Sequence, residues 1–251
     1  MRRKERLARG EFLAEGPQAL RESLAAGEPP RLVLTTQRAA DRHPELLHRA
    51  SRAGVTTALL TEDEFASITD ASTPQGIAAV CRTLDVDLET ALAGTPRLVV
   101  CCAEIRDPGN AGTVIRCADA AGADAVILGS ASVDPYNPKT VRASTGSIFH
   151  LPIVVDAQLS TALARCRDRG LQILAAAGGA SYALDELARA GELVRPTVWL
   201  MGNEAHGLDT DQLALADRAV SVPIYGAAES LNLSTAAAIC LYASAFAQRA
   251  N

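Results

Sequence analysis

The sequence is poor in aromatic residues and lacks the features of membrane and exported proteins. Aromatic residues make up 4% of its 251 residues, whereas hydrophobic residues as a whole make up 48%. Because no apolar run reaches about 18 residues, no membrane-spanning helix is predicted. The basic N-terminus is not followed by an apolar signal-peptide core, so we do not expect export.

Cysteine and histidine are arranged in ways that do not favour metal binding. The six cysteines include no C-x-x-C pair, and several lie in apolar runs, where a buried, reduced thiol is the simplest interpretation. His43 and His48 are spaced poorly for a metal on one helix face, and His150 and His206 are isolated. We therefore predict a cytoplasmic protein without a metal site.

Three widespread site patterns are also missing. The chain has no G-x-x-x-x-G-K-[ST] phosphate loop, no G-x-G-x-x-G after a strand and no G-x-S-x-G elbow. A P-loop enzyme, a common dinucleotide fold and a serine hydrolase of the elbow type are therefore not supported.

The net charge of −5 argues mildly against wholesale binding of nucleic acid, but the charge is unevenly distributed. The first 82 residues hold 12 of the 24 Lys and Arg residues and 11 of the 29 Asp and Glu residues. The basic residues cluster at the N-terminus, as Arg2, Arg3, Lys4, Arg6 and Arg9. Such a cluster can contact phosphates, and a solvated tail explains it equally well.

Residues 1–82 have the pattern of a small α/β domain. Strands are expected at 12–14, 31–35, 55–60 and 75–80, and helices at 18–26, 44–53 and 62–68. Thr61 and Glu64 form a capping-box pattern at the start of the last of these helices. Because the segment has no cluster of potential catalytic groups, we interpret it as a recognition domain. Residues 83–96 have the composition of a linker with one helical turn.

Beyond residue 96 the pattern changes to buried strands alternating with helices. Near-continuous apolar runs predict strands at 97–103, 125–128, 148–155, 171–176 and 197–201, separated by helices at 111–121, 159–169 and 209–216. This alternation predicts a parallel sheet with helices on both faces. Ligands of such sheets bind beyond the carboxyl ends of the strands, so the loops there are the place to look for a site.

The first unusual loop spans residues 105–116. Asp107-Pro108-Gly109 is expected to form a turn, and Asn110 is a fitting N-cap for the following helix. Arg116 lies six residues later, roughly 9 Å along the helix axis, and its stem leans back over Gly112. On an otherwise apolar helix, Arg116 is either a surface residue or one aimed at a ligand.

Two further loops carry polar residues among glycines and small residues. In residues 200–208, Glu204 either caps backbone donors or holds a ligand or basic partner. Residues 221–238 read as a short strand ended by Pro223, a bend at Gly226 and the start of a long helix, for which Ser230 and Asn232 are both candidate N-caps. Exposed N–H groups at a helix start can bind a small ligand closely.

Together the three loops resemble the SpoU family of RNA ribose methyltransferases, in the SPOUT superfamily. The family patterns N-x-G-x-x-x-R, G-x-E-x-x-G and S-L-N-x-S-x-A occur in family order, the third after a V-P-I triplet at 222–224. Their residues here are Asn110, Gly112 and Arg116; Gly202, Glu204 and Gly207; and Ser230, Leu231, Asn232, Ser234 and Ala236. The set is specific and covers about residues 97–249. The N-terminal part is similar to the small ribosomal-protein-like RNA-binding domain of many members.

The resemblance implies an α/β fold with two domains. Residues 97–251 would form a trefoil-knotted, parallel-sheet SPOUT methyltransferase domain, and residues 1–82 a smaller RNA-recognition domain. From the basic N-terminal cluster we predict Arg9 as an RNA contact. The family also implies a homodimer with the site at the subunit interface. S-adenosylmethionine would bind in the knot. Backbone groups around Leu200, Gly202, Val222, Ile224, Leu231 and Leu233 would hold it, with help from the turn at Thr145 and Gly146.

By the same resemblance, Arg116 contacts the target ribose or phosphate and assists loss of the 2′-hydroxyl proton, while Asn110, Glu204, Ser230 and Asn232 shape the site. Positioning and proton removal are what a ribose hydroxyl needs to accept a methyl group. Methylation of a base carbon would call for a cysteine nucleophile, and none of the three loops contains one. The resemblance, including that of the N-terminal domain, implies methylation of a ribose in 23S ribosomal RNA, without a metal. A tRNA methyltransferase and an RNA-binding assembly factor of the same fold remain alternatives.

Overall fold

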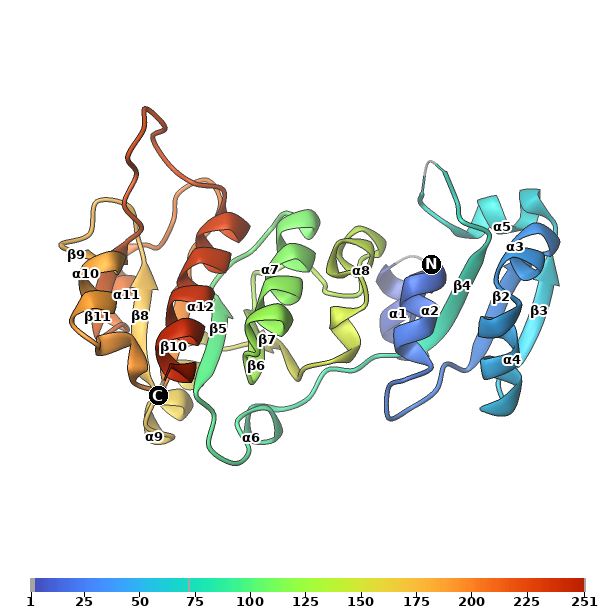
Figure 1. Cartoon of the computed structure of the whole chain (residues 1–251), viewed down its shortest axis with the longest axis horizontal. Coiled ribbons are helices and arrows are strands. Elements are labelled where there is room, and N and C mark those ends of the chain that lie inside the picture. The colour runs from blue at the N-terminus through green and yellow to red at the C-terminus, as the bar shows by residue number, and fades with distance from the viewer. Residues whose placement is uncertain (1–2, 72, 251) are drawn as a thin grey trace. The chain divides into compact units, whose positions relative to one another are not determined.

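The computed structural model describes residues 3–71 and 73–250, and the chain divides into two compact units (Figure 1). The first unit contains the chain up to Leu84 together with residues 134–150, and the second contains the remainder. Arg2 of the predicted basic cluster lies outside the described residues. Within the described part of the chain, no helix has the length and apolar character needed to span a membrane.

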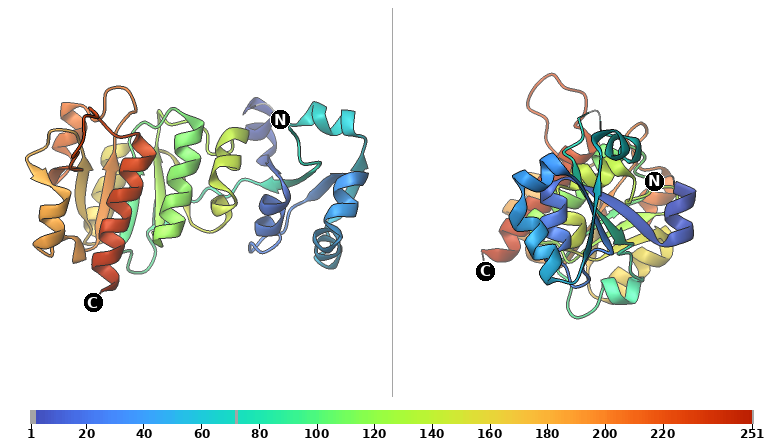
Figure 2. Two further views of the ribbon diagram at one scale, coloured as in Figure 1. Left: turned by 45° about the horizontal axis from the view of Figure 1, so that its top comes forward. Right: turned by 90° about the vertical axis from the view of Figure 1, so that its right-hand side faces the viewer.

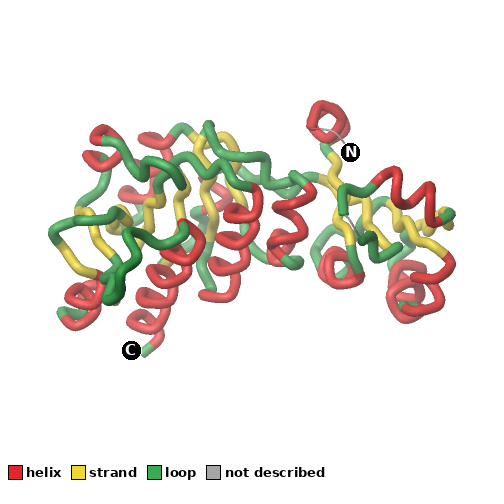
Figure 3. The backbone as a smooth tube through the Cα atoms, turned by 90° about the horizontal axis from the view of Figure 1, so that it is seen from above, coloured by secondary structure: helices red, strands yellow, loops and turns green. Residues whose placement is uncertain are grey.

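The first unit is built on a four-stranded sheet in the order β1-β4-β2-β3. Strand β4 runs antiparallel to β1 and β2, whereas β2 and β3 are parallel. Helices lie on both sides of the strands in this unit (Figure 3). Its elements are α1 (Arg3–Arg9), β1 (Glu11–Glu15), α2 (Pro17–Ser23), β2 (Leu32–Thr36), α3 (Gln37–Arg42), α4 (Pro44–Arg52), β3 (Thr56–Leu60), α5 (Glu62–Ile68) and β4 (Ile77–Arg82).

Two local predictions for this unit have clear outcomes. The capping box of Thr61 and Glu64 at the start of α5 is confirmed, since each side chain accepts a hydrogen bond from the other residue's backbone N–H. The basic N-terminal segment forms helix α1, in which Arg6 is buried and contacts Asp134 at 2.6 Å. Arg6 is therefore committed to an internal ion pair and does not face solvent.

Residues 134–150 follow β6 (Ala125–Gly129) in sequence but pack within the first unit. They form α8 (Pro138–Ser144) and the 3₁₀ turn η1 (Ser147–Phe149). The ring of Phe12 lies 4.8 Å from that of Tyr136 and 5.9 Å from that of Phe149. The prediction that a strand begins at residue 148 is wrong. Residues 147–149 form a 3₁₀ turn instead, preceded by Gly146 with a φ of +97°. Strand β7 (Ile153–Ala157) begins only after this turn.

The second unit contains a seven-stranded sheet in the order β7-β6-β5-β10-β8-β11-β9, and every described pairing in it is parallel. The predicted parallel sheet is thus confirmed. The remaining elements are α6 (Leu88–Ala91), β5 (Leu98–Cys102), α7 (Pro108–Ala121), α9 (Leu159–Asp168), β8 (Gln172–Ala176), β9 (Tyr182–Ala183), α10 (Leu184–Arg189), η2 (Glu192–Val194), β10 (Thr197–Met201), α11 (Thr210–Ala214), β11 (Arg218–Ser221) and α12 (Leu233–Arg249).

Successive side chains of a strand point to opposite faces of the sheet, and in the central strands the side chains on both faces are mostly apolar. Both faces of this sheet are therefore covered. On one face, Val198 and Leu200 join a buried cluster with residues of α6 and α9. On the other face α7 and α12 lie side by side (Figures 1 and 2), and Trp199 Nε1 donates a 2.9 Å hydrogen bond to Ser244 Oγ of α12. The carboxyl ends of the central strands are left for loops.

The segment predicted as a linker is largely part of the second unit. Residues from Asp85 onward belong to this unit, and Ala91 and Leu92 of the short α6 region are buried in its core. Asp85 also forms a bridge with Ile153 at the edge of β7. The burial of Ala91 and Leu92 holds the segment against the second unit. The composition of the segment did not reveal this burial.

Candidate active site

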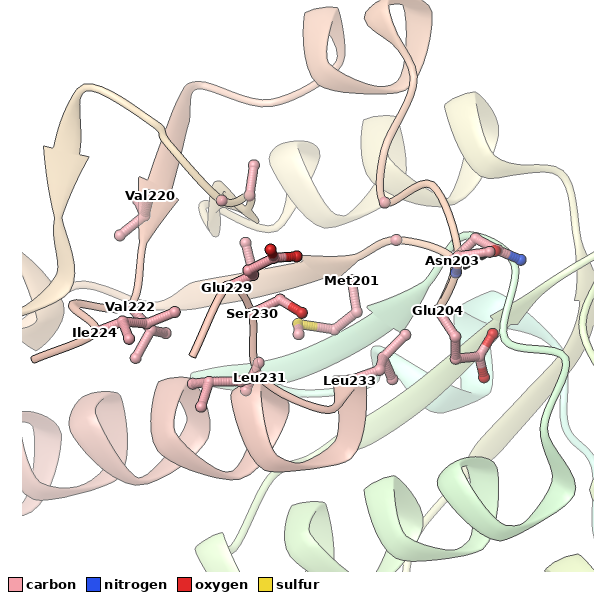
Figure 4. Close-up of a pocket in the computed structure, with 17 residues that line it drawn as sticks. Met201, Asn203, Glu204, Val220, Val222, Ile224, Glu229, Ser230, Leu231 and Leu233 are labelled. Atoms are coloured by element: carbon pink, nitrogen blue, oxygen red, sulfur yellow. Dashed lines mark hydrogen bonds between the residues drawn. The ribbon is translucent and has the colours of Figure 1, made fainter. Parts of the chain in front are cut away.

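A pocket with a cavity volume of about 280 Å³ lies beyond the carboxyl ends of β8, β10 and β11 (Figure 4). Val222 and Ile224 lie at one end of it and Glu204 at the other. Its lining consists mostly of small and apolar residues: Ala176, Ala177, Gly178, Met201, Gly202, Asn203, Glu204, Ala205, Gly207, Val220, Val222, Ile224, Glu229, Ser230, Leu231, Leu233 and Ala236. This is the edge of a parallel sheet at which ligands are expected.

The loop after β10 is folded tightly back on itself. Asn203 and Gly207 exchange two backbone hydrogen bonds, of 2.8 and 2.9 Å. A Cβ atom on Gly202 would lie 2.3 Å from the carbonyl carbon of Gly207, so only glycine fits there. The Asn203 side chain donates to the carbonyl of Glu104 at 3.3 Å and accepts from the N–H of Ala205 at 2.8 Å. The loop is therefore shaped to hold Glu204 against the loop that precedes α7.

Glu204 receives hydrogen bonds from three donors of that neighbouring loop. The backbone N–H groups of Asp107 and Arg106 donate to its carboxylate at 3.0 and 3.2 Å, and Asn110 Nδ2 donates at 3.3 Å. Partial burial by itself would raise the pKa of Glu204, but these bonds and its own backbone N–H outweigh it and lower the pKa below the ordinary value. Glu204 is thus a fixed anion that accepts hydrogen bonds.

Asn110 links Glu204 to the third loop. Its Oδ1 accepts a 3.0 Å hydrogen bond from Asn232 Nδ2. Asn232 Oδ1 in turn caps α12 by accepting from the N–H groups of Ser234 and Thr235, at 2.9 and 3.4 Å. The structure therefore joins the three sequence motifs in one chain of hydrogen bonds, from Glu204 through Asn110 to Asn232.

Two predicted caps need correction. Asn110 is not the N-cap of α7, because Asp107 occupies that position and accepts a 2.8 Å hydrogen bond from the Asn110 N–H. Pro108 fits the first helical position, where no N–H is required. Of the two candidate caps for α12, Asn232 is the cap, while Ser230 lies upstream and lines the pocket. The side chains of Asn110 and Ser230 do not cap a helix, so both are available for the site.

The other predicted catalytic residue, Arg116, lies elsewhere on α7. It is exposed, it is not among the residues lining the pocket, and it stands more than one turn beyond Asn110. Tyr242 of α12 donates to the carbonyl of Ala120, one turn after Arg116, at 3.4 Å. Arg116 is therefore exposed on α7 and stands apart from the pocket lining.

Five of the predicted cofactor residues line the pocket, namely Gly202, Val222, Ile224, Leu231 and Leu233. Three do not. Leu200 points into the buried core and the pocket is lined instead by Met201, as the alternation of a strand requires. Thr145 and Gly146 belong to the first unit, where Thr145 lines a different cavity. The role of Thr145 and Gly146 in cofactor binding remains a prediction.

Sequence reasoning did not single out the lining residues at the end of β8, Ala176 to Gly178, nor Asn203 and Glu229. The Ala-Gly-Gly sequence after a predicted strand was the available signal for the first group. Among the residues that the structure describes, no group of three or more His, Cys, Asp and Glu side chains could hold a metal ion.

Comparison with known proteins gives two family matches. The sequence profile of the SpoU rRNA Methylase family matches residues 97–242, and that of the MRM3-like substrate binding domain matches residues 1–79. The first match covers more than half of the chain and contains all three motif loops.

Individual relatives match over nearly the full length. The chain is 37% identical to the 23S rRNA (guanosine(2553)-2′-O)-methyltransferase RlmP of Bacillus subtilis, over 96% of this chain and 90% of that protein. It is 32% identical to the 23S rRNA (uridine(2479)-2′-O)-methyltransferase of Streptomyces viridochromogenes, over 96% and 84%. The solved structure of the SpoU methyltransferase AviRb from Streptomyces viridochromogenes with its cofactor AdoMet matches with a TM-score of 0.87 and 28% identity, over 100% of this chain and 95% of that one.

Proposed function

Because the chain belongs to the SpoU rRNA methylase family, we propose that it transfers a methyl group from S-adenosylmethionine to a ribose 2′-hydroxyl of 23S ribosomal RNA. The observation that carries the proposal is the hydrogen-bonded chain of Glu204, Asn110 and Asn232 beside the pocket. Both named relatives act on a 2′-hydroxyl of 23S rRNA, which favours ribosomal RNA over tRNA as the substrate.

The residues that line the pocket suit the proposed cofactor chemically. Gly202 lets the backbone of the 202–208 loop close on itself, and Val222, Ile224, Leu231 and Leu233 provide apolar surface for an adenine. The carboxylate of Glu229 also lines the pocket and suits a ligand that carries positive charge. When bound, S-adenosylmethionine supplies a methyl group already activated by its sulfonium.

The chain's own residues supply positioning and charge. The guanidinium of Arg116 stabilises the negative charge that develops on the ribose oxygen as its proton leaves. The network of Asn110, Glu204 and Asn232 fixes the loops around the site, and Ser230 contributes a hydroxyl to the pocket wall. Glu204 is already charged and accepts three hydrogen bonds from the neighbouring loop, so we assign it a positioning role.

The thiols of the chain do not suit the alternative of base-carbon methylation. Burial raises the pKa of the Cys102, Cys166 and Cys240 thiols to about 12, which keeps them protonated at neutral pH. Burial also raises the pKa of Cys117, although Arg116 partly opposes the shift. A thiolate nucleophile is therefore not favoured, whereas an oxygen acceptor needs none.

A homodimer is part of the proposal. Ile239, Tyr242 and Phe246 form an exposed apolar stripe on α12, with 38%, 37% and 69% of their surfaces accessible. Their spacing of three and four residues places them on one helix face. A second copy packed on this stripe would cover it, and by the family resemblance the site would lie at the interface between the two copies.

The remaining parts of the proposal concern recognition and location. The first unit would bind the RNA, with the exposed Arg9 as a contact and Arg6 excluded by its buried pairing with Asp134. Residues 97–251 would carry the trefoil knot of the family. A cytoplasmic location accords with a ribosomal substrate and with cysteines that are all unpaired.

Incubation of the protein with isotopically labelled S-adenosylmethionine and unmodified 23S rRNA tests the proposal. Nucleoside analysis by mass spectrometry should find the label in a 2′-O-methyl nucleoside. Label in a methylated base would refute ribose methylation. Absence of transfer, together with tight RNA binding, would favour the assembly-factor alternative.

A further inference from the structure

Among the large hydrophobic residues that the structure describes, Tyr225 is the most exposed, with 89% of its surface accessible. It lies in the loop between β11 and α12, and its neighbour Ile224 is 40% exposed. Two consecutive exposed apolar side chains in an otherwise small and polar loop need an explanation, because burying them would be favourable.

The other aromatic side chains of the second unit each have a partner. Trp199 is buried and hydrogen-bonded to Ser244, the guanidinium carbon of Arg218 lies 5.2 Å from the ring centre of Tyr182, and the rings of Tyr242 and Phe246 are 5.5 Å apart. No hydrogen bond or ring contact of Tyr225 is found among residues 3–71 and 73–250. Packing within the unit therefore does not account for Tyr225.

The position of Tyr225 connects it to the active site. Ile224 before it and Glu229 and Ser230 after it all line the pocket, so the loop that carries the ring forms one wall of the cofactor site. The ring itself is not part of the lining and is held outside it. A side chain there meets whatever molecule approaches the cofactor from solvent.

The exposed ring of Tyr225 offers a π-face on which a base can stack.

We infer that the ring of Tyr225 is a docking site for an unpaired RNA base next to the ribose that is methylated. The inference rests on the proposed function, and it adds a contact that the family motifs do not include. A ribose can reach the cofactor only where its nucleotide is pulled out of a helix, and unstacked RNA bases are typically received on aromatic rings or guanidinium planes. The ring of Tyr225, rather than its hydroxyl, is the group that acts.

The test compares Tyr225→Ala with Tyr225→Phe in the full-length protein, with Tyr182→Ala as a control for loss of another surface tyrosine. Affinity for a 23S rRNA fragment is measured by fluorescence anisotropy, and KM and kcat by methyl transfer. Tyr225→Ala should weaken RNA binding and raise KM roughly 10-fold, in line with the loss of one base–aromatic stack. Tyr225→Phe and the control should behave as wild type, and the affinity for S-adenosylmethionine should not change.

Several outcomes would overturn the inference. Equal RNA affinity of wild type and Tyr225→Ala would exclude stacking on this ring, whether or not the protein turns over. A loss in Tyr225→Phe as large as that in Tyr225→Ala would assign the effect to the hydroxyl. Dissociation of a dimer by Tyr225→Ala would show that the ring contacts a second copy instead of RNA. Absence of methyl transfer by the wild type would count against the proposed function, while the binding measurement would still decide the role of Tyr225.

Discussion

Asn232 Nδ2 donates a 3.0 Å hydrogen bond to Asn110 Oδ1, across 122 positions of sequence. The same two side chains use their other ends for Glu204 and for the cap of α12. Each amide is therefore oriented by two partners, and neither can be reversed without losing both bonds. This pairing is what makes three separate loops behave as one site.

Asn110→Asp tests this pairing with a nearly isosteric change. The substitution turns the donor that faces Glu204 into an acceptor and places two carboxylates against each other, so kcat/KM should fall roughly 10- to 100-fold. Asn137→Asp is the matched control, because Asn137 only accepts a bond from the Lys139 N–H, which an aspartate also does. Unchanged kcat/KM in Asn110→Asp would show that the chain of hydrogen bonds is not needed.

The lowered pKa of Glu204 predicts how its contribution depends on pH. A carboxyl whose folded pKa is depressed stabilises the fold fully above its unfolded value, which is ordinarily 4.5, and loses that contribution as the pH falls through the folded pKa. The stability difference between wild type and Glu204→Gln should therefore be constant between about pH 6 and pH 8 and shrink in acid. Urea unfolding across this range measures it. A difference that varies near neutrality would mean that Glu204 is not a fixed anion.

Arg116→Ala should lower kcat by about 100-fold or more, the scale expected for loss of a residue that assists proton removal. Cofactor affinity should be retained, because Arg116 does not line the pocket. Arg165→Ala, which removes a half-exposed arginine paired with Glu89, serves as the control. Persistence of methyl transfer in Arg116→Ala would remove the residue from the mechanism.

Phe246→Asp should convert the proposed dimer to a monomer, since it places a charge in the apolar stripe of α12. Sedimentation velocity measures the change, and activity should fall with it if Arg116 acts in the site of the other copy. Leu7→Asp alters a residue that is equally exposed, at 70%, on α1 of the other unit, and should leave the assembly intact. A Phe246→Asp protein that sediments like wild type would place any interface elsewhere.

Removal of the whole N-terminal segment is a poorer test of RNA recognition than point variants are. Phe12 packs against Tyr136 and Phe149, so deletion of residues 1–82 would strip cover from two aromatic rings of the segment 134–150. Arg9→Glu instead reverses one exposed charge without disturbing packing. It should reduce RNA affinity and the steepness of its salt dependence.

The sequence predicted those features that depend on local pattern. Near-continuous apolar strands predicted the parallel sheet, and the side chains of Thr61 and Glu64 predicted their capping box. Asn232 was one of two predicted caps of α12. The sequence misplaced features in which two local rules compete. Asp107 and Asn110 are both good caps, and Pro108 decides between them by occupying the first helical position.

The features that the sequence did not reveal depend on contacts between distant segments. The pairing of Arg6 with Asp134 spans 128 positions, and no local pattern distinguishes Arg6 from the neighbouring exposed arginines. Likewise, Leu200 and Met201 are both apolar residues at the end of β10, and only the direction of the strand shows which of them faces the pocket. The motif residues Asn110, Glu204 and Asn232 could be named individually, but their mutual hydrogen bonds required the fold.

The central claim is that the pocket beside these loops holds S-adenosylmethionine, and isothermal titration of the cofactor into wild type and Gly202→Val tests it most directly. Even the Cβ of the substitution would meet the Gly207 backbone, whereas Gly27→Ala adds a Cβ to open space and serves as the control. Saturable binding by wild type and by the control, lost in a Gly202→Val protein that remains folded, is the predicted result. Undiminished binding by Gly202→Val would contradict the placement of the cofactor, and absence of binding by the wild type would contradict the proposed reaction.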